Sequence, residues 1–186
     1  MPLHQNSTVT TAKLLVGNCK IETSASAAGT YINVGAGMVS ASIHEVERYT
    51  VQAGNAPDPL EGVSDETIKV SFEMIEYDAS VLAAMSGGLF TSSTTASTQT
   101  IHAGGNNTIT PRAFKFTNTK YIDTATVTTI LTVYHATMDT GLAINWKSDN
   151  DSDPIAVMPG SITGKILDSL TIGKQLYTLT RQGVAI

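Results

Sequence analysis

The sequence predicts a mainly β protein, a sandwich or barrel-like sheet with long hairpins and one short α-helix. Charged residues make up only 15% of the chain, and threonine accounts for about one residue in seven. Low charge combined with many β-branched residues favours pleated surfaces over long amphipathic helices. Within residues 66–74 (ETIKVSFEM), polar and apolar side chains alternate strictly from Thr67 onward, which is the period of a half-buried strand. With 186 residues, the chain is long enough for one domain with a core of its own.

The N-terminal quarter is expected to hold an arm followed by strands. Residues 1–14 are interpreted as an N-terminal arm and residues 15–186 as a single β domain, because the first 11 residues are polar and have no period. Short strands are expected at residues 13–16, 19–23 and 31–34, separated by glycine and other small residues.

The next segment predicts a long hairpin. Residues 38–52 are long for a strand, and their apolar phase shifts near His44, which indicates a β-bulge or a strong bend. Residues 54–64 (GNAPDPLEGVS) contain two prolines and predict a loop. Residues 66–77 then pair back as the second arm of this hairpin.

A short helix is expected directly after the hairpin. The carboxylate of Asp78 can accept hydrogen bonds from the free N–H groups of the first turn. Gly87 can supply the left-handed conformation that ends a helix. A helix of two turns is not stable alone, so it must pack on the sheet. Its apolar stripe consists of Val81, Leu82 and Met85.

The second half of the chain predicts another hairpin between loops. Residues 87–110 are rich in serine, threonine, glycine and asparagine, and predict a long loop that is functional or ordered by a partner. Residues 111–121 and 125–137 predict the second long hairpin, and residues 146–154 an acidic loop. Residues 160–181 are expected to form a strand, a turn and a strand.

Charge, cysteine content and hydropathy exclude several classes of function. The net charge of −5 argues against binding of nucleic acid through phosphate neutralisation, which needs a basic patch. The single cysteine, Cys19, cannot form an internal disulfide and is expected to be a small buried hydrophobe. The first 17 residues lack the basic and apolar regions of a signal peptide, and no window approaches the roughly 20 apolar residues of a membrane span. We therefore expect no membrane partner.

Motifs for catalysis and cofactor binding are missing from the sequence. It contains no G-x-S-x-G, no P-loop and no complete dinucleotide-binding glycine motif. Glu45, Glu47 and Glu73 lie on predicted strands that could face a common space, but charged strand faces are usually solvated. We expect a protein that is not an enzyme and that binds no cofactor.

The best candidate for a metal site is the acidic segment DNDSDP. Its alternating carboxylates match the first half of an EF-hand loop. Pro154 stands where that loop needs glycine, and Gly160 where it needs a bidentate glutamate. A solvated turn before a strand is the alternative that these departures favour. The weak candidate ligands are Asp149, Asp151 and Asp153.

The order of these elements resembles that of phage major tail tube proteins. Two stretches carry the resemblance: ETIKVSFEMIEYDASVLAAMSGG, where a hairpin strand leads into an acid-capped helix, and MPGSITGKILDSLTIGKQLYTL near the end. It covers residues 15–182. The resemblance implies the tail tube fold and a structural virion protein. Such subunits form hexameric rings whose hairpins close a β-barrel around a channel, and the rings stack into the tube through which DNA is ejected.

The resemblance also implies partners and a location. The partners are further copies of the chain within and between rings, a tape-measure protein in the lumen, the tail terminator and tail-tip proteins, and DNA in non-specific passage. The protein would be assembled in the host cytoplasm and reside in the tail of the virion.

Two sets of residues follow for the tube. Closure across neighbouring subunits would remove the exposed edges of long strands. The polar face of the strand would then look into a wet lumen, and the apolar face would cover the core of the subunit. The lumen-facing candidates are Thr67, Lys69, Ser71 and Glu73, and the candidates for a loop between rings are Pro57, Asp58, Pro59 and Glu61.

Other functions fit the same β-rich pattern. A tail terminator forms a single ring, and a capsid decoration protein forms trimers or monomers on a shell, so the oligomeric state separates both from a tube. The tube of a contractile tail or of a secretion apparatus is a further possibility. A carbohydrate-binding or adhesin sandwich would normally show a leader and an aromatic platform, whereas this chain has one tryptophan.

Overall fold

The structure is a computed structural model that describes residues 18–51, 60–75, 78–105, 108–122, 125–139, 158–172 and 175–183, with only the backbone described at residues 42–44, 51, 60, 122 and 125. In chain order its elements are β1 (Cys19–Ser24), β2 (Ile32–Val51), β3 (Leu60–Met74), α1 (Ala79–Met85), β4 (Phe90–Thr94), β5 (Gln99–Ala103), β6 (Arg112–Ile122), β7 (Ala125–Met138), β8 (Met158–Lys165) and β9 (Tyr177–Gln182).

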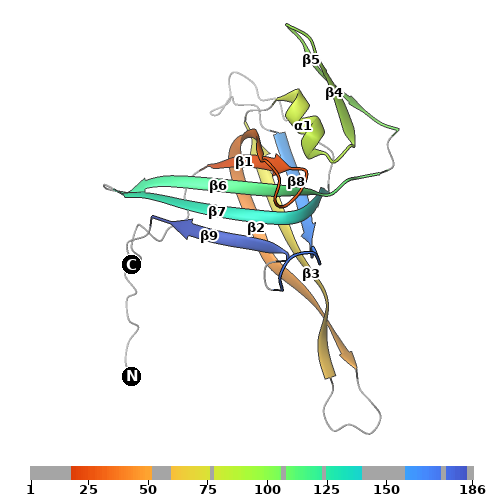
Figure 1. Ribbon diagram of the computed structural model, residues 1–186, viewed down its shortest axis with the longest axis vertical. Coiled ribbons are helices and arrows are strands. Elements are labelled where there is room, and N and C mark those ends of the chain that lie inside the picture. Colours follow the sequence, from red (N-terminus) through yellow and green to blue (C-terminus); the bar gives the residue numbers. More distant parts are fainter. Residues whose placement is uncertain are drawn as a thin grey trace, which may run out of the picture.

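The main sheet closes on itself into a small barrel (Figure 1). Its strands follow the order β6-β1-β2-β3-β8-β7, and β7 pairs back with β6. β8 and β9 share the edge of β7 that faces away from β6. β7 pairs with β9 over residues 128–133 and with β8 over residues 136–138. Every pairing is antiparallel. The prediction of a mainly β, barrel-like protein with long hairpins and one short helix is confirmed.

The alternation of residues 66–74 forms the centre of the core. The apolar side chains of this stretch are at most 2% exposed, and the side chains between them point outward. Phe72 lies 6.3 Å from Phe116 between ring centroids, which links β3 to the opposite side of the barrel. Burial of each large side chain stabilises the fold by about 1.5–3 kcal/mol. The buried set on β3 is Ile68, Val70, Phe72 and Met74.

β2 is one continuous strand, whereas the sequence predicts two strands with a break at residues 35–37. Gly37 lies opposite Met74, and a Cβ atom built on it would approach the carbonyl oxygen of Glu73 to 1.8 Å. Glycine is therefore required there for close approach of two strands and not for a turn.

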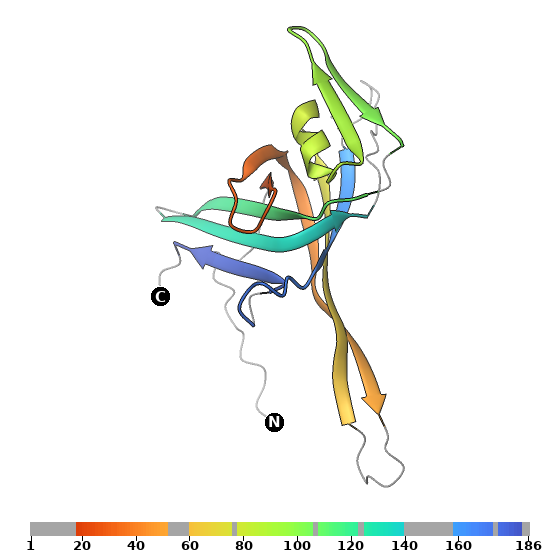
Figure 2. The ribbon, with the colours of Figure 1, turned by 45° about the vertical axis from the view of Figure 1, so that its right-hand side comes forward.

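β2 and β3 extend past the barrel as a two-stranded arm (Figures 1 and 2). β1 accompanies β2 only as far as Gly37, and β8 accompanies β3 only from Thr67. From the pair Val46 and Glu66 to the pair Val51 and Leu60, β2 and β3 have only each other as partners within the described residues. We call residues 45–51 and 60–66 the arm.

The predicted loop at residues 54–64 is wrong in its last part, because Leu60 to Ser64 belong to β3. Tyr49 pairs with Gly62, and its ring lies over that glycine. An aromatic ring across a strand glycine supplies the packing that glycine lacks, which explains why this residue does not end the strand.

The predicted phase shift near His44 is confirmed as a β-bulge. The register of β2 and β3 shifts between Ser42 and Glu45, where β2 holds one extra residue. A second shift lies between Glu47 and Arg48, and Ser64 is the extra residue on β3. The Ser64 hydroxyl donates to the Glu47 carbonyl oxygen at 3.1 Å.

The helix begins and ends as the sequence predicts. Oδ1 of Asp78 accepts from the backbone N–H groups of Ser80 at 2.8 Å and Val81 at 3.3 Å. Hydrogen bonds from the Ser80 side chain and from these backbone groups hold the pKa of Asp78 below its usual value. Gly87 follows the C-cap with a φ of +64°. Leu82 and Met85 are buried, and Val81 packs partly against the core.

The predicted loop at residues 87–110 is wrong in its centre, where β4 and β5 form a hairpin. The serine and threonine residues that suggested a loop pair across this hairpin, where β-branched threonine suits a strand. The backbone N–H of Thr95 donates to the carbonyl oxygen of Thr98 at 2.9 Å and closes the turn. Gln99 ties the hairpin to α1, since its side-chain oxygen accepts from the Ala79 N–H at 3.2 Å. The hairpin and α1 lie at the opposite end of the molecule from the arm (Figure 2).

The two strands predicted near the C-terminus are present as β8 and β9, but they do not pair with each other, since each pairs with β7. The second long hairpin is confirmed as β6 and β7.

Candidate assembly surfaces

The predicted lumen-facing residues lie on one continuous outer face of the sheet. The register places Lys69 beside Ser42 and Thr163, and the other candidates beside further β2 and β8 residues. Lys69, Ser71 and Glu73 are exposed, and Thr67 is half-buried. We define the lumen-candidate face by the described residues Met38, Ser40, Glu45, Thr67, Lys69, Ser71, Glu73, Pro159, Ser161, Thr163 and Lys165. That this face lines a channel stays a prediction.

The charges on this face are balanced. Lys69 Nζ lies 3.4 Å from Glu45 Oε2, and the two side chains are 58% and 42% exposed. Glu73 and Lys165 add one charge of each sign. The bulge near His44 places Glu45 and Glu47 on this side of the hairpin, since they pair with Thr67 and Asp65. Because Glu45 neutralises Lys69, the face offers phosphate groups no isolated cation there.

A charge reversal at Lys69 should leave the subunit folded. In Lys69→Glu, a carboxylate replaces an ammonium group that is mostly exposed, so the free energy of unfolding should fall by less than about 1 kcal/mol. Urea denaturation measures this loss, with Lys165→Glu on β8 as a control on the same face. Loss of the folded state would mean that Lys69 does not lie on a solvated face.

Long strand edges remain unpaired in the described part of the chain. From Met38 to Val51 the outer edge of β2 meets no other strand, and β9 has no partner besides β7. Apolar side chains accompany these edges: Met38 is 66% exposed and Leu179 is 49% exposed. Free edges with exposed apolar side chains favour pairing with another chain.

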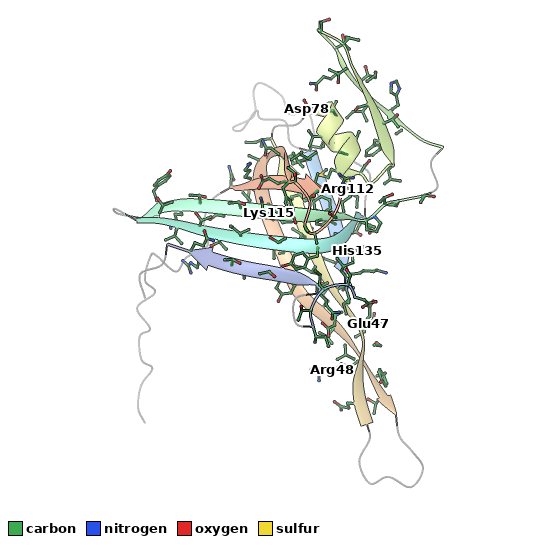
Figure 3. The ribbon with its side chains drawn as sticks, in the orientation of Figure 1. Glu47, Arg48, Asp78, Arg112, Lys115 and His135 are labelled. Atoms are coloured by element: carbon green, nitrogen blue, oxygen red, sulfur yellow. The ribbon has the colours of Figure 1, made fainter. Side chains whose placement is uncertain are left out.

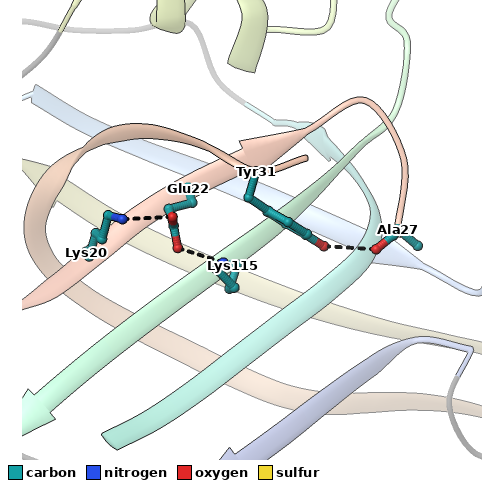
Figure 4. A network of polar contacts seen from close by, with 5 residues as sticks. All are labelled: Lys20, Glu22, Ala27, Tyr31 and Lys115. Carbon is teal, nitrogen blue, oxygen red and sulfur yellow. Dashed lines mark hydrogen bonds and ion pairs between the residues drawn. The ribbon is translucent and has the colours of Figure 1, made fainter. Parts of the chain in front are cut away.

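A charged cluster lies at the start of the sheet, where β1 meets β6 (Figure 4). Glu22 is only 8% exposed and receives hydrogen-bonded ion pairs from Lys20 at 2.8 Å and Lys115 at 2.9 Å. The Lys115 ammonium also lies 4.6 Å from the centre of the Tyr31 ring. The Tyr31 hydroxyl donates to the Ala27 carbonyl oxygen at 3.4 Å. Sequence reasoning missed this cluster, because only the β1–β6 register brings its charges together.

The cluster makes stability depend on pH. Burial alone would raise the pKa of Glu22, but hydrogen bonds and charge from Lys20 and Lys115 outweigh burial and lower the pKa below 4.5. A carboxyl whose pKa is lowered by folding stabilises the fold fully above its unfolded pKa, and the stabilisation is lost as the pH falls through the folded value.

We expect Glu22→Gln to lose about 1–2 kcal/mol of unfolding free energy at pH 7, because charge-assisted hydrogen bonds are lost. The difference from the wild type should shrink as the pH falls below 4.5. Urea denaturation at pH 7 and in steps down to pH 3 measures it, with Glu73→Gln on an exposed site as control. A difference that does not change with pH would contradict this role of Glu22.

The remaining predicted residues are placed as follows. Glu61 is exposed on the arm, opposite Thr50. Glu45 pairs with Thr67, which precedes Glu73 on β3 by about 20 Å along the strand. The carboxylates of Glu45 and Glu73 therefore form no catalytic pair. Cys19 is half-buried, and burial raises the pKa of its thiol. The residues outside the described part of the chain are Pro57, Asp58, Pro59, Asp149, Asp151 and Asp153.

Neither a metal centre nor a membrane helix is found within the described ranges. These ranges contain no group of three or more histidine, cysteine or acidic side chains that could hold a metal ion. No described helix combines the length and the hydrophobicity that a membrane span requires.

Comparison with known proteins finds likeness among solved structures. No protein-family model and no curated protein matches the sequence. Among solved structures, the chain is similar to the cap that terminates the tube of the anti-feeding prophage, determined by cryo-EM, with a TM-score of 0.47 and 9% identity. The similarity spans 99% of this chain and 97% of that chain. Because a similarity of this size is too low to establish a shared function, the function is inferred from the residues of this chain.

Proposed function

We propose that the chain is a structural subunit of a phage tail or tail-like particle, which assembles into hexameric rings that stack into the tail tube. The observation that carries this proposal is the β2–β3 arm, a two-stranded ribbon whose β2 edge pairs with no other strand among the described residues. A two-stranded hairpin is marginally stable in water unless something covers it.

The side chains of the arm support assembly between copies. Val46, Tyr49 and Val63 are 38%, 50% and 51% exposed on the arm. An exposed edge with apolar side chains invites uncontrolled association unless a defined partner covers it. In a closed ring, each copy covers the next and no edge remains at the end of the series.

The lumen-candidate face suits a conduit. It consists mainly of serine, threonine and charges of both signs in equal number, and its candidates Thr67, Lys69, Ser71 and Glu73 lie opposite the core. A wall without a net positive patch lets DNA pass without binding. In this proposal a tape-measure protein fills the channel first, and terminator and tail-tip proteins close the two ends of a tube in the virion.

The second candidate is a ring that ends a tube instead of forming its length, as a tail terminator or a tube-terminating cap does. It uses the same arm and the same ring. The two functions differ in whether a ring binds a further copy of itself on both ends or on one end only, so the number of stacked rings separates them.

The test compares the wild type with a chain whose arm is shortened. Residues 47–65 are replaced by Asn-Gly, which can form a two-residue turn between Val46 and Glu66, a pair in the native register. Light scattering with size exclusion should give six times 19.6 kDa for the assembled wild type and 1 copy for the shortened chain. Circular dichroism should show the same β content per remaining residue. Rings formed by the folded, shortened chain would contradict the proposal.

A further inference from the structure

The charged residues of the molecule are distributed unevenly between two regions. The arm carries one cation, Arg48, and its carboxylates outnumber this cation five to one within the described residues. Two of these carboxylates, Glu47 and Asp65, face each other directly across the strands. Like charges in this position destabilise an isolated hairpin. The carboxylates of the arm are Glu45, Glu47, Glu61, Asp65 and Glu66.

Positively charged residues are concentrated near the end of β6 that leads into its hairpin turn, on β6 itself, on the adjacent β1 and on β9. Thr117 pairs with Lys20, and Thr129 pairs with both Asn118 and Arg181, so these rows lie next to each other. We call this region the basic end. On its outward side lie the cations Lys20 and Lys115 with one carboxylate, Glu22, whereas Lys120 and Arg181 lie on the side that faces the core, since they pair with the buried Val127 and with Thr129.

The basic end also has the surface of a docking site. Its outward row across four strands consists of Lys20, Thr117, Ile130 and Thr180, which alternate with core residues such as Phe116. Apart from Lys20, this row carries no charge that a partner would have to desolvate. Near the hairpin turn, Tyr121 is 81% exposed. Exposed tyrosine is enriched in contacts between proteins.

The arm and the basic end of one subunit lie apart. The arm leaves the barrel in one direction and the β6–β7 hairpin in another, and both views agree on this (Figures 1 and 2). Glu47 and Arg48 lie on the arm, whereas Lys115 lies on the barrel (Figure 3). An attraction between these two regions therefore acts between copies of the chain.

We infer that the acidic arm of one copy docks on the basic end of a neighbouring copy. The inference rests on the proposed ring and names the surfaces that meet in it. The contact joins two different patches, so it is heterologous and can close a ring. Cations from the neighbour also relieve the repulsion between Glu47 and Asp65.

Charge reversal tests the contact. Glu47→Lys/Asp65→Lys should raise the concentration for half-maximal assembly at least about tenfold, because each strand of the arm then repels the basic end. The control Glu73→Lys/Asp168→Lys changes the net charge equally outside the arm and should leave assembly within about twofold of the wild type. Adding Thr117→Glu/Thr119→Glu, two changes on the outward side of β6, to the arm variant should restore assembly.

Cross-linking locates the contact even if the basic-end variant does not fold. In a Cys19→Ala background, a Glu47→Cys chain is mixed with a Thr117→Cys chain, and oxidation should give the mixed dimer in excess of the dimers of either chain alone. A Ser71→Cys chain replaces the arm chain as a matched control. Rings without this mixed cross-link would overturn the docking but leave the proposed ring intact. A wild type that stays monomeric at every concentration would exclude both.

Discussion

Phe72→Ala is expected to lower the free energy of unfolding by about 3–5 kcal/mol, among the largest losses from a single truncation in this core. Phe72 is 2% exposed, lies 6.3 Å from the Phe116 ring, and covers Gly160, which offers no side chain to fill the space. The cavity therefore opens between three strands that are held by their own hydrogen bonds and cannot collapse into it.

Urea denaturation at pH 7 measures this loss. Ser71→Ala, the outward-facing neighbour on β3, is the matched control and should change the free energy by less than about 0.5 kcal/mol. A loss below 1 kcal/mol for Phe72→Ala would show that β3 does not lie at the centre of the core.

Gly37→Ala is expected to cost more than about 3 kcal/mol, because a Cβ atom there meets backbone and not a movable side chain. The built atom lies 1.8 Å from the Glu73 carbonyl oxygen and 2.7 Å from its carbonyl carbon. β2 and β3 must separate at this point, where β1 also pairs with β2.

Gly62→Ala provides the control on the same hairpin. Its Cβ atom would meet the Tyr49 ring at 2.4 Å, but that ring is 50% exposed and can swing into solvent. We expect a loss below about 1 kcal/mol there. Equal losses at both glycines in thermal or urea denaturation would contradict the close approach of the two strands at Gly37.

The features predicted correctly from the sequence depend on neighbouring residues. The alternation of residues 66–74, the cap at Asp78 and the left-handed Gly87 each act within one strand or one turn. The phase shift near His44 belongs to the same class, since an extra residue in a strand changes its own pattern. Local periodicity and capping therefore predicted the strand, the bulge and the helix.

The missed features depend on residues distant in the sequence. Gly62 remains in a strand because Tyr49 covers it, and β5 is held to the helix by Gln99. The Glu22 and Lys115 pair exists only because β1 and β6 are neighbours. The sequence predicted which side of β3 is exposed, but whether that side lines a channel depends on a second copy of the chain.

The central claim, that this chain forms rings through its arm, is tested most directly by negative-stain electron microscopy of the concentrated wild-type protein at neutral pH. The account predicts hollow particles with sixfold averages, either stacked into tubes of uniform bore or present as single rings, and their loss when residues 47–65 are replaced by Asn-Gly. Small compact particles at every concentration, or rings that persist without the arm, would contradict it.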